Sequence, residues 1–215
     1  MSDADFTVFL VDDDRGVLKA LSRLLRAAAY ETRTFASPRD FLAKHDPSVP
    51  GCAVFDVGMP EVDGLQLQHA LAEGGLDRPV IFITGNGDVP TSVRAMKAGA
   101  IDFLTKPVSG DDLLAAVQRA RQAETRARET RSERTAIEAS LAKLTPRERE
   151  VLTHVVAGRL NKQIAGDLGT VEKTIKVHRA RMMSKLGVRT VQDLVRLAER
   201  VDIRPPGGIG QPKTS

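Results

Sequence analysis

The chain has 215 residues, of which 41% are hydrophobic and 28% charged, and its formal net charge is +4 at pH 7. This length predicts two modest domains, and no apolar run approaches the roughly 20 residues of a membrane span. The single cysteine, Cys52, excludes an internal disulfide and a metal site built on several thiolates. With the acidic start "MSDADF", it predicts a reducing, cytoplasmic location without a membrane partner.

Charge is divided unevenly between the two halves of the chain. Residues 1–124 hold 13 Lys and Arg against 18 Asp and Glu, a net charge of −5, whereas residues 125–215 hold 19 against 10, a net charge of +9. The basic second half favours a polyanion as partner. Because solvated basic faces are common, charge alone does not identify a nucleic-acid site. The absence of tryptophan argues against an aromatic platform for single-stranded nucleic acid.

Strand-like and helix-like segments alternate through the first half. Apolar or β-branched runs predict strands at 7–11, 31–35, 52–56, 79–84 and 101–105. Amphipathic stretches predict the helices that follow them, at 17–29, 38–45, 64–73, 89–99 and 109–120. Five strand–helix units in succession predict an α/β fold, a parallel sheet with helices on both faces.

The second half predicts helices only. Residues 125–140 contain no Pro or Gly and carry acid–base pairs four apart, which favours a helical linker. Residues 144–201 predict four helices, the first with Thr145 as N-cap and Glu148 at N3. A short helix, a tight turn and a longer basic helix form a helix-turn-helix pattern. We therefore expect domains at 1–124 and 141–203, and a disordered Pro- and Gly-rich tail at 204–215.

Polar residues follow the strands of the first domain where each strand ends: Asp12, Asp13, Asp56, Thr84 and Lys106. The carboxyl ends of parallel strands share one edge of a sheet, so we expect these side chains to converge there. Each has a structural explanation when taken alone, such as helix capping, but their joint placement favours a site. Three close carboxylates need a compensating cation, and carboxylate and carbonyl ligands in an open cleft suit Mg²⁺.

These residue types are suited to phosphoryl chemistry. With Mg²⁺ nearby, Asp56 is placed to attack phosphorus, and Lys106 to neutralise phosphoryl oxygens. Thr84 is placed to donate a hydrogen bond to the phosphate. Asp14, the third of three consecutive aspartates, is instead expected to interact with the start of the next helix, where a negative charge is favourable.

The segments "VDDD", "FDVGMPEVDG" and "TGNGDVPTSVRAMKAGAIDFLTKP" resemble the receiver domain of two-component response regulators, the CheY-like fold with strand order 2-1-3-4-5. The third segment is similar to the FixJ/StyR-type branch, and the resemblance covers roughly residues 5–124. It implies that Asp56 accepts a phosphoryl group from a sensor histidine kinase. It also implies Mg²⁺, with Mn²⁺ or Ca²⁺ as substitutes, bound by Asp13, Asp56 and the backbone carbonyl of Gly58, with Asp12 acting mostly through water.

The same resemblance assigns two further positions. Phe103 takes the place of the switch aromatic, without the hydroxyl of the tyrosine that many relatives carry, and the Lys106–Pro107 bond is expected to be cis. Asn86 departs from the histidine that close relatives often carry beside the site.

A second resemblance covers the basic domain. "LTPRE", "NKQIA" and "VEKTIKVHRARMMSKLGV" are similar to the LuxR/FixJ-type DNA-binding domain. It implies that four residues face the major groove: Thr174, Lys176, Val177 and Arg181. It also implies that Lys162 and Lys173 lie near phosphates. In the groove, Lys176 can donate to guanine O6 and N7, and Val177 can touch a thymine methyl group.

Together these features predict a transcriptional regulator rather than an enzyme, although its receiver domain would assist its own phosphoryl transfer and dephosphorylation. Phosphorylation of Asp56 is expected to promote a homodimer through the face around 89–99 and 101–120, and binding to promoter DNA, with RNA polymerase as a further partner. Two alternatives remain: a phosphohydrolase with an aspartyl-phosphate intermediate, and a DNA-binding protein that does not depend on phosphorylation. The short loops offer no dedicated substrate pocket, which disfavours the first.

Overall fold

The computed structural model describes residues 6–85 and 89–203. The chain forms two compact units, an N-terminal unit, Met1–Arg128, and a C-terminal unit, Glu129–Ser215. Asn86 and the tail 204–215 lie outside the described residues, so the expectations for them stay predictions.

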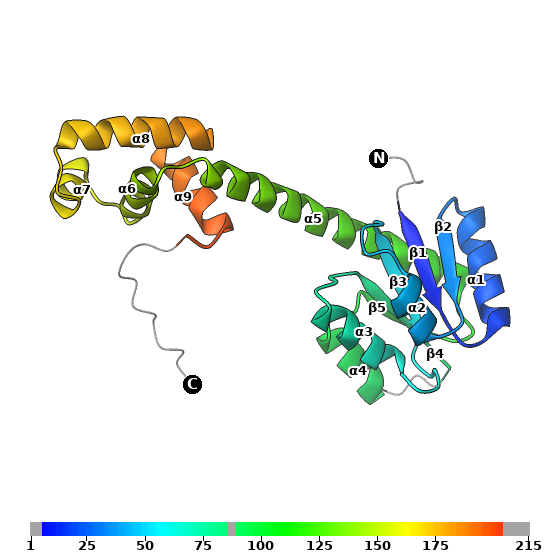
Figure 1. Cartoon of the computed structure of the whole chain (residues 1–215). Coiled ribbons are helices and arrows are strands. Elements are labelled where there is room, and N and C mark those ends of the chain that lie inside the picture. The colour runs from blue at the N-terminus through cyan, green and yellow to red at the C-terminus, as the bar shows by residue number, and fades with distance from the viewer. Residues whose placement is uncertain (1–5, 86–88, 204–215) are drawn as a thin grey trace. The chain divides into compact units, whose positions relative to one another are not determined.

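The N-terminal unit contains a five-stranded parallel sheet (Figure 1). Its strands are β1 (Thr7–Val11), β2 (Glu31–Phe35), β3 (Gly51–Asp56), β4 (Val80–Thr84) and β5 (Asp102–Thr105). Their order is β2-β1-β3-β4-β5, which confirms the predicted doubly wound fold. The helices that alternate with them are α1 (Arg15–Ala27), α2 (Pro38–Lys44), α3 (Gly64–Glu73), α4 (Val89–Lys97) and α5 (Gly110–Ala142).

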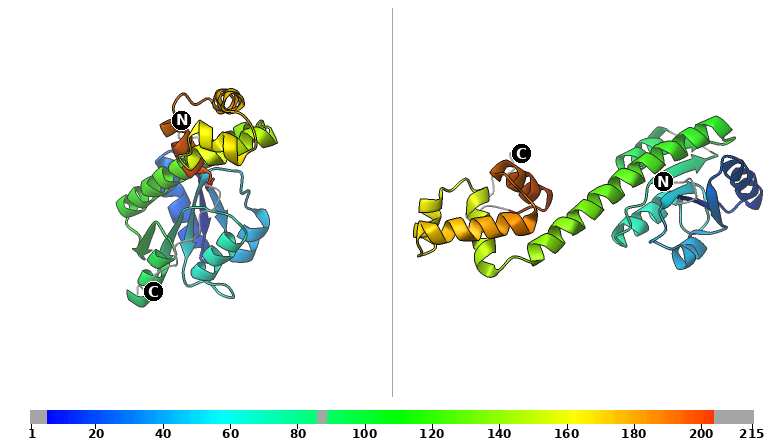
Figure 2. Two further views of the ribbon diagram at one scale, coloured as in Figure 1. Left: turned by 90° about the vertical axis from the view of Figure 1, so that its left-hand side faces the viewer. Right: turned by 90° about the horizontal axis from the view of Figure 1, so that it is seen from above.

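Helices cover both faces of this sheet (Figure 1, Figure 2). Successive side chains of a strand point to opposite faces. Leu10 and Ile81 therefore pack in one core with α1 and α5, while Phe9, Phe55 and Phe82 pack in the other with α2, α3 and α4. Because both faces are buried, the central strands are apolar at nearly every position, which is the pattern that indicated a parallel sheet.

Helix α5 is a single helix of 33 residues. Leu113, Val117 and Ala120 are buried against the sheet in its first turns. Near its C-terminal end, Leu141 packs against the core of the C-terminal unit. The predicted helical continuation beyond residue 120 is thus confirmed, and residues of both units belong to α5.

The C-terminal unit contains the four predicted helices, α6 (Pro146–Val156), α7 (Asn161–Asp167), α8 (Glu172–Leu186) and α9 (Val191–Arg200). Their apolar faces share a core built around Val151, Ile164, Ile175, Met182 and Leu194. Residues 168–171 connect α7 to α8, and within them Gly169 has a φ of +62°, a conformation that glycine adopts without strain. The pair α7–α8 is the helix-turn-helix.

Five helices in the described part of the chain have a polar N-cap residue whose side chain accepts a hydrogen bond from the first turn. These residues are Asp14 for α1, Ser37 for α2, Asp63 for α3, Thr145 for α6 and Thr190 for α9. Asp14 accepts from the backbone N–H of Gly16 at 2.7 Å, as expected for the third consecutive aspartate. The helices of the helix-turn-helix differ, because the N-cap residues of α7 and α8 are Leu160 and Val171, neither of which makes a side-chain cap hydrogen bond. A polar N-cap stabilises a helix by about 0.5–2 kcal/mol.

Glu148 is a buried carboxylate of α6. Its Oε2 accepts from the N–H of Thr145 at 2.8 Å and from Lys185 Nζ at 2.6 Å. The hydrogen bond from Lys185, and after it the one from Thr145, lowers the pKa of Glu148 below its ordinary value. Since the folded pKa lies below the unfolded one, this carboxylate stabilises the fold above the unfolded pKa, and the contribution is lost as pH falls through the folded pKa.

Replacing Glu148 with glutamine should destabilise the C-terminal unit by about 1–3 kcal/mol near neutral pH, because the buried acceptor of the Lys185 ammonium loses its negative charge. The difference between wild type and variant should shrink below about pH 4, where unfolded glutamate becomes protonated. Amide hydrogen exchange of α6 and α8 in the full chain measures both effects. Glu150→Gln is the control, since its exposed pair with Arg147 contributes little. A difference that persists at acid pH would contradict the charge-based explanation.

Candidate functional site

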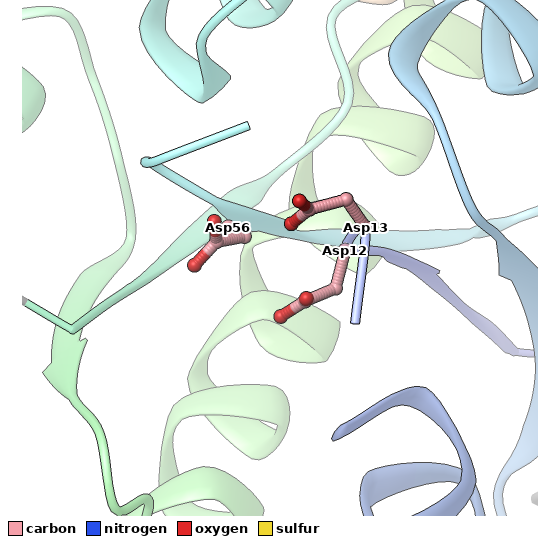
Figure 3. Close-up of side chains that lie close together, drawn as sticks. All are labelled: Asp12, Asp13 and Asp56. Carbon is pink, nitrogen blue, oxygen red and sulfur yellow. The ribbon is translucent and has the colours of Figure 1, made fainter. Parts of the chain in front are cut away.

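Three carboxylates gather at the C-terminal edge of the sheet (Figure 3). Asp12 and Asp13 follow β1, and Asp56 is the last residue of β3. Each offers an oxygen, and these oxygens all lie within 4.8 Å of one another. Asp12 and Asp56 are buried, whereas Asp13 is exposed to solvent. The structure thus brings Asp56 close to Asp12 and Asp13, which lie more than forty positions earlier in the sequence.

Lys106, which follows β5, joins two of these carboxylates. Its Nζ lies 2.7 Å from Asp12 Oδ2 and 2.8 Å from Asp56 Oδ1. Burial alone would lower the pKa of Lys106, but its hydrogen bonds to the two aspartates outweigh burial and raise that pKa above its ordinary value. Burial raises the pKa of Asp12, and the hydrogen bonds from Lys106 and from the Asp14 N–H offset this only in part.

Backbone groups hold the carboxylates in place. The N–H of Gly58 donates to Asp56 Oδ2 at 3.0 Å, and the N–H of Asp14 donates to Asp12 Oδ1 at 2.8 Å. A Cβ atom at Gly64 would lie 2.5 Å from the carbonyl oxygen of Asp56. Only glycine therefore lets the start of α3 approach the backbone of Asp56 this closely.

An open cleft of about 410 Å³ lies beside Asp56, lined by Asp56, Val57, Gly58, Thr84, Gly85, Thr91 and Lys106. Thr84 is the last residue of β4 and is buried at this edge. The sequence did not indicate that Thr91, on α4, belongs to this cleft, because nothing in "VPTSV" distinguishes it from a surface residue. The cleft leaves room for a group the size of a phosphate next to Asp56.

Phe103 and the peptide bond after Lys106 complete this edge of the sheet. Phe103 is half-buried on β5, and its ring centroid lies 6.5 Å from that of Phe82. The Lys106–Pro107 peptide bond is cis, as the resemblance implied.

The acidic cluster fits a divalent cation. Its three carboxylates and the one ammonium of Lys106 leave a formal charge of −2 when all are ionised. Mg²⁺ prefers oxygen ligands, keeps several waters and binds through a few carboxylates at an open site. Asp12, Asp13 and Asp56 supply such ligands, and the exposed Asp13 faces solvent.

In the C-terminal unit, the expected DNA contacts lie on α7 and α8. The side chains of Lys162, Lys173, Lys176, Val177 and Arg181 are exposed, and that of Thr174 is half-buried. On the opposite side of α8, Ile175 and Met182 are buried in the core. This arrangement leaves one side of α8 open to a partner.

Two polar contacts on this surface were not anticipated. Lys176 Nζ forms an ion pair with Glu172 Oε1 at 3.0 Å, one helical turn away. Arg179 donates to Asn161 Oδ1 at 3.0 Å and so links α8 to the first residue of α7. The second contact joins residues of different helices, so no spacing along one helix indicates it.

Comparisons with known proteins agree with both units. Residues 8–118 match the family model of the response regulator receiver domain, and residues 142–198 match that of the bacterial regulatory proteins of the luxR family. The response regulator protein TmoT of Ectopseudomonas mendocina is 44% identical, over 94% of this chain and 91% of its own. The transcriptional regulatory protein FixJ of Rhizobium meliloti is 39% identical, over 90% of this chain and 95% of its own. The solved structure of the response regulator StyR is 44% identical and similar at a TM-score of 0.79, over 92% of this chain and all of its own.

The chain therefore belongs to the response regulators that join a receiver domain to a LuxR-type DNA-binding domain. It is a transcriptional regulator, and its two domains imply a kinase and DNA as partners. Receiver domains of this family bind Mg²⁺ through acidic residues, and Asp12, Asp13 and Asp56 form such a cluster. None of the helices in the described part of the chain combines the length and the apolar character that crossing a membrane requires.

Proposed function

We propose that Asp56 is the phosphoryl acceptor and takes its phosphoryl group from the phosphohistidine of a sensor kinase. The observation that carries this proposal is the hydrogen bonding of Lys106 to both Asp12 and Asp56 beside an open cleft. In the transfer, a carboxylate oxygen of Asp56 attacks phosphorus, the bond from phosphorus to the histidine nitrogen breaks, and an acyl phosphate forms.

The neighbouring residues have distinct roles in this proposal. Lys106 moves from its carboxylate partners to the phosphoryl oxygens, and Thr84 donates its hydroxyl to the same group. Asp12, Asp13, Asp56 and the Gly58 carbonyl would hold Mg²⁺, or Mn²⁺ or Ca²⁺ in its place, which would supply positive charge beside the phosphoryl oxygens. The same groups would assist the later hydrolysis of the acyl phosphate.

We further propose that phosphorylation promotes a homodimer. Val89, Val93 and Met96 are exposed on α4 and spaced to form one apolar stripe, which supports this face as the interface. The signal would pass from Thr84 to Phe103 and change the packing of the α4–β5–α5 face. Phosphorylation shifts such an equilibrium only by interacting differently with the two states.

In the C-terminal unit, we propose that α8 enters the major groove of promoter DNA. Thr174, Lys176, Val177 and Arg181 would face base edges, and Lys162 and Lys173 would lie near phosphates, where lysines add affinity but little sequence choice. We place the receiver at 1–124, the helical linker at 125–140 and the DNA-binding domain at 141–203. The regulator would act in the cytoplasm, with RNA polymerase as a further partner.

Full-length protein treated with acetyl phosphate and Mg²⁺ should gain the mass of one phosphoryl group. The gain should disappear in EDTA, because the clustered carboxylates need a divalent cation beside an incoming phosphate. The phosphorylated sample should dimerise in light scattering. It should also bind duplexes selected from a random-sequence library about 5- to 150-fold more tightly, the usual size of such couplings.

Other outcomes would favour the alternatives. Continuous release of phosphate from a small phosphate ester would support a phosphohydrolase. A mass gain without any change in DNA affinity would support a DNA-binding protein that is independent of phosphorylation. The absence of a mass gain would contradict the proposed acceptor chemistry.

A further inference from the structure

Three large apolar side chains are exposed in the described residues of the C-terminal unit: Leu160, Val171 and Val177, at 68%, 65% and 44%. All three belong to the helix-turn-helix, because Leu160 and Val171 directly precede α7 and α8, and Val177 lies on α8. In the described part of this unit, the most exposed large apolar side chains are therefore confined to the helix-turn-helix.

Val171 occupies a position where a polar residue would stabilise the helix. Helices α6 and α9 of the same unit begin with Thr145 and Thr190, whose side chains accept hydrogen bonds from the backbone of their first turns. Val171 makes no such bond and leaves most of its surface in water. A valine at this position cannot make the capping hydrogen bond. Packing within the protein does not explain why valine stands here, because so little of its side chain is buried.

The chemistry of Val171 indicates what it contacts. Glu172, the first residue of α8, places a carboxylate at this helix end and pairs with Lys176 at 3.0 Å. The Val171 side chain has neither a charge nor a hydrogen-bond donor with which to bind a phosphate, so a base edge is the better partner for it. The N-terminal residues of a recognition helix contact base edges in the major groove. The apolar group displayed there is the 5-methyl group of thymine.

We propose that Val171 is a specificity-determining residue that contacts the methyl group of a thymine in the operator. The inference rests on the proposed entry of α8 into the major groove. Val177 lies six positions further along, about 9 Å at the rise of an α-helix. Because base pairs are about 3.4 Å apart, Val171 and Val177 contact different thymines.

The probe is a synthetic duplex selected by the full-length protein from a random-sequence library and made without 5-methylcytosine. Each thymine is replaced in turn by deoxyuridine, which removes only the methyl group. Affinities at one fixed salt concentration are measured for wild type, Val171→Ala, Val177→Ala and Leu160→Ala. Leu160→Ala is the matched control, because Leu160 is equally exposed but precedes the helix that crosses the DNA backbone.

Replacement of one particular thymine by deoxyuridine should weaken wild-type binding about fourfold, because one methyl group is no longer in contact. The same replacement should leave the affinity of Val171→Ala unchanged. Val177→Ala should become insensitive at a different thymine, and Leu160→Ala should respond as wild type does. Val171→Ser should also lose the response while α8 gains a cap, which separates recognition from folding.

Equal sensitivity of wild type and Val171→Ala at every thymine would overturn the inference, as would a selected duplex without thymine in the contacted half. If α8 does not enter the major groove, a different result is expected: Lys176→Ala leaves sequence-specific binding unchanged. Lys176→Ala is therefore titrated against the same duplexes as the other variants, which makes the two failures distinguishable.

Discussion

Replacing Asp56 with asparagine should reduce phosphoryl incorporation from acetyl phosphate and Mg²⁺ to background, as measured by intact-protein mass spectrometry. An amide lacks the anionic oxygen that attacks phosphorus. Asparagine keeps nearly the same shape, and Lys106 keeps its hydrogen bond to Asp12, so the edge of the sheet should remain folded. The variant should also lose any increase in DNA affinity that follows treatment with acetyl phosphate.

Asp14→Asn is the matched control for this substitution. Asp14 is exposed and caps α1 through hydrogen bonds from the N–H groups of Gly16 and Val17. Asparagine is an equally good N-cap, so this variant should be phosphorylated as wild type is. Phosphorylation of Asp56→Asn at the wild-type rate would show that another group is the acceptor and would exclude the proposed role of Asp56.

The sheet and its acidic edge were predictable from residues near one another in the sequence. Runs such as "TVFLV" and "VIFIT" are buried on both faces, so nearly all their residues are apolar. Each run therefore predicts a strand by itself. Once five strands are parallel, their carboxyl ends must share an edge, and Asp12, Asp56 and Lys106 must lie at it. The parallel topology therefore specifies which residues share this edge of the sheet.

Contacts within that edge depend on rotamers and turns, which sequence patterns do not specify. The simultaneous bonding of Lys106 to Asp12 and Asp56, and the close approach of α3 at Gly64, were not predicted. The ion pair of Lys185 with Glu148 spans 37 positions in an all-helical unit and follows no helical period. By contrast, the helix beyond residue 120 was predictable because its stabilising pairs are local.

Lys176→Ala should weaken binding to the selected duplex by about 10- to 100-fold and relax the preference for guanine at one position, because a lysine contact to guanine O6 and N7 is lost. Phosphorylation of Asp56 should be unchanged. Stability should change little, since the only ion pair of Lys176 that the described residues show joins it to Glu172, and both side chains are exposed. Binding to the selected and to unrelated duplexes, measured over a series of salt concentrations, gives the result.

Lys162→Ala is the control for this prediction. Lys162 is exposed on α7 and is proposed to lie near a phosphate, so its loss should weaken binding to all sequences alike and reduce the salt dependence by about one charge. The two lysines carry the same charge, so their variants differ only in what each lysine contacts. If Lys176→Ala behaved as Lys162→Ala does, Lys176 would be a phosphate contact, and sequence choice would have to come from the remaining residues of α8.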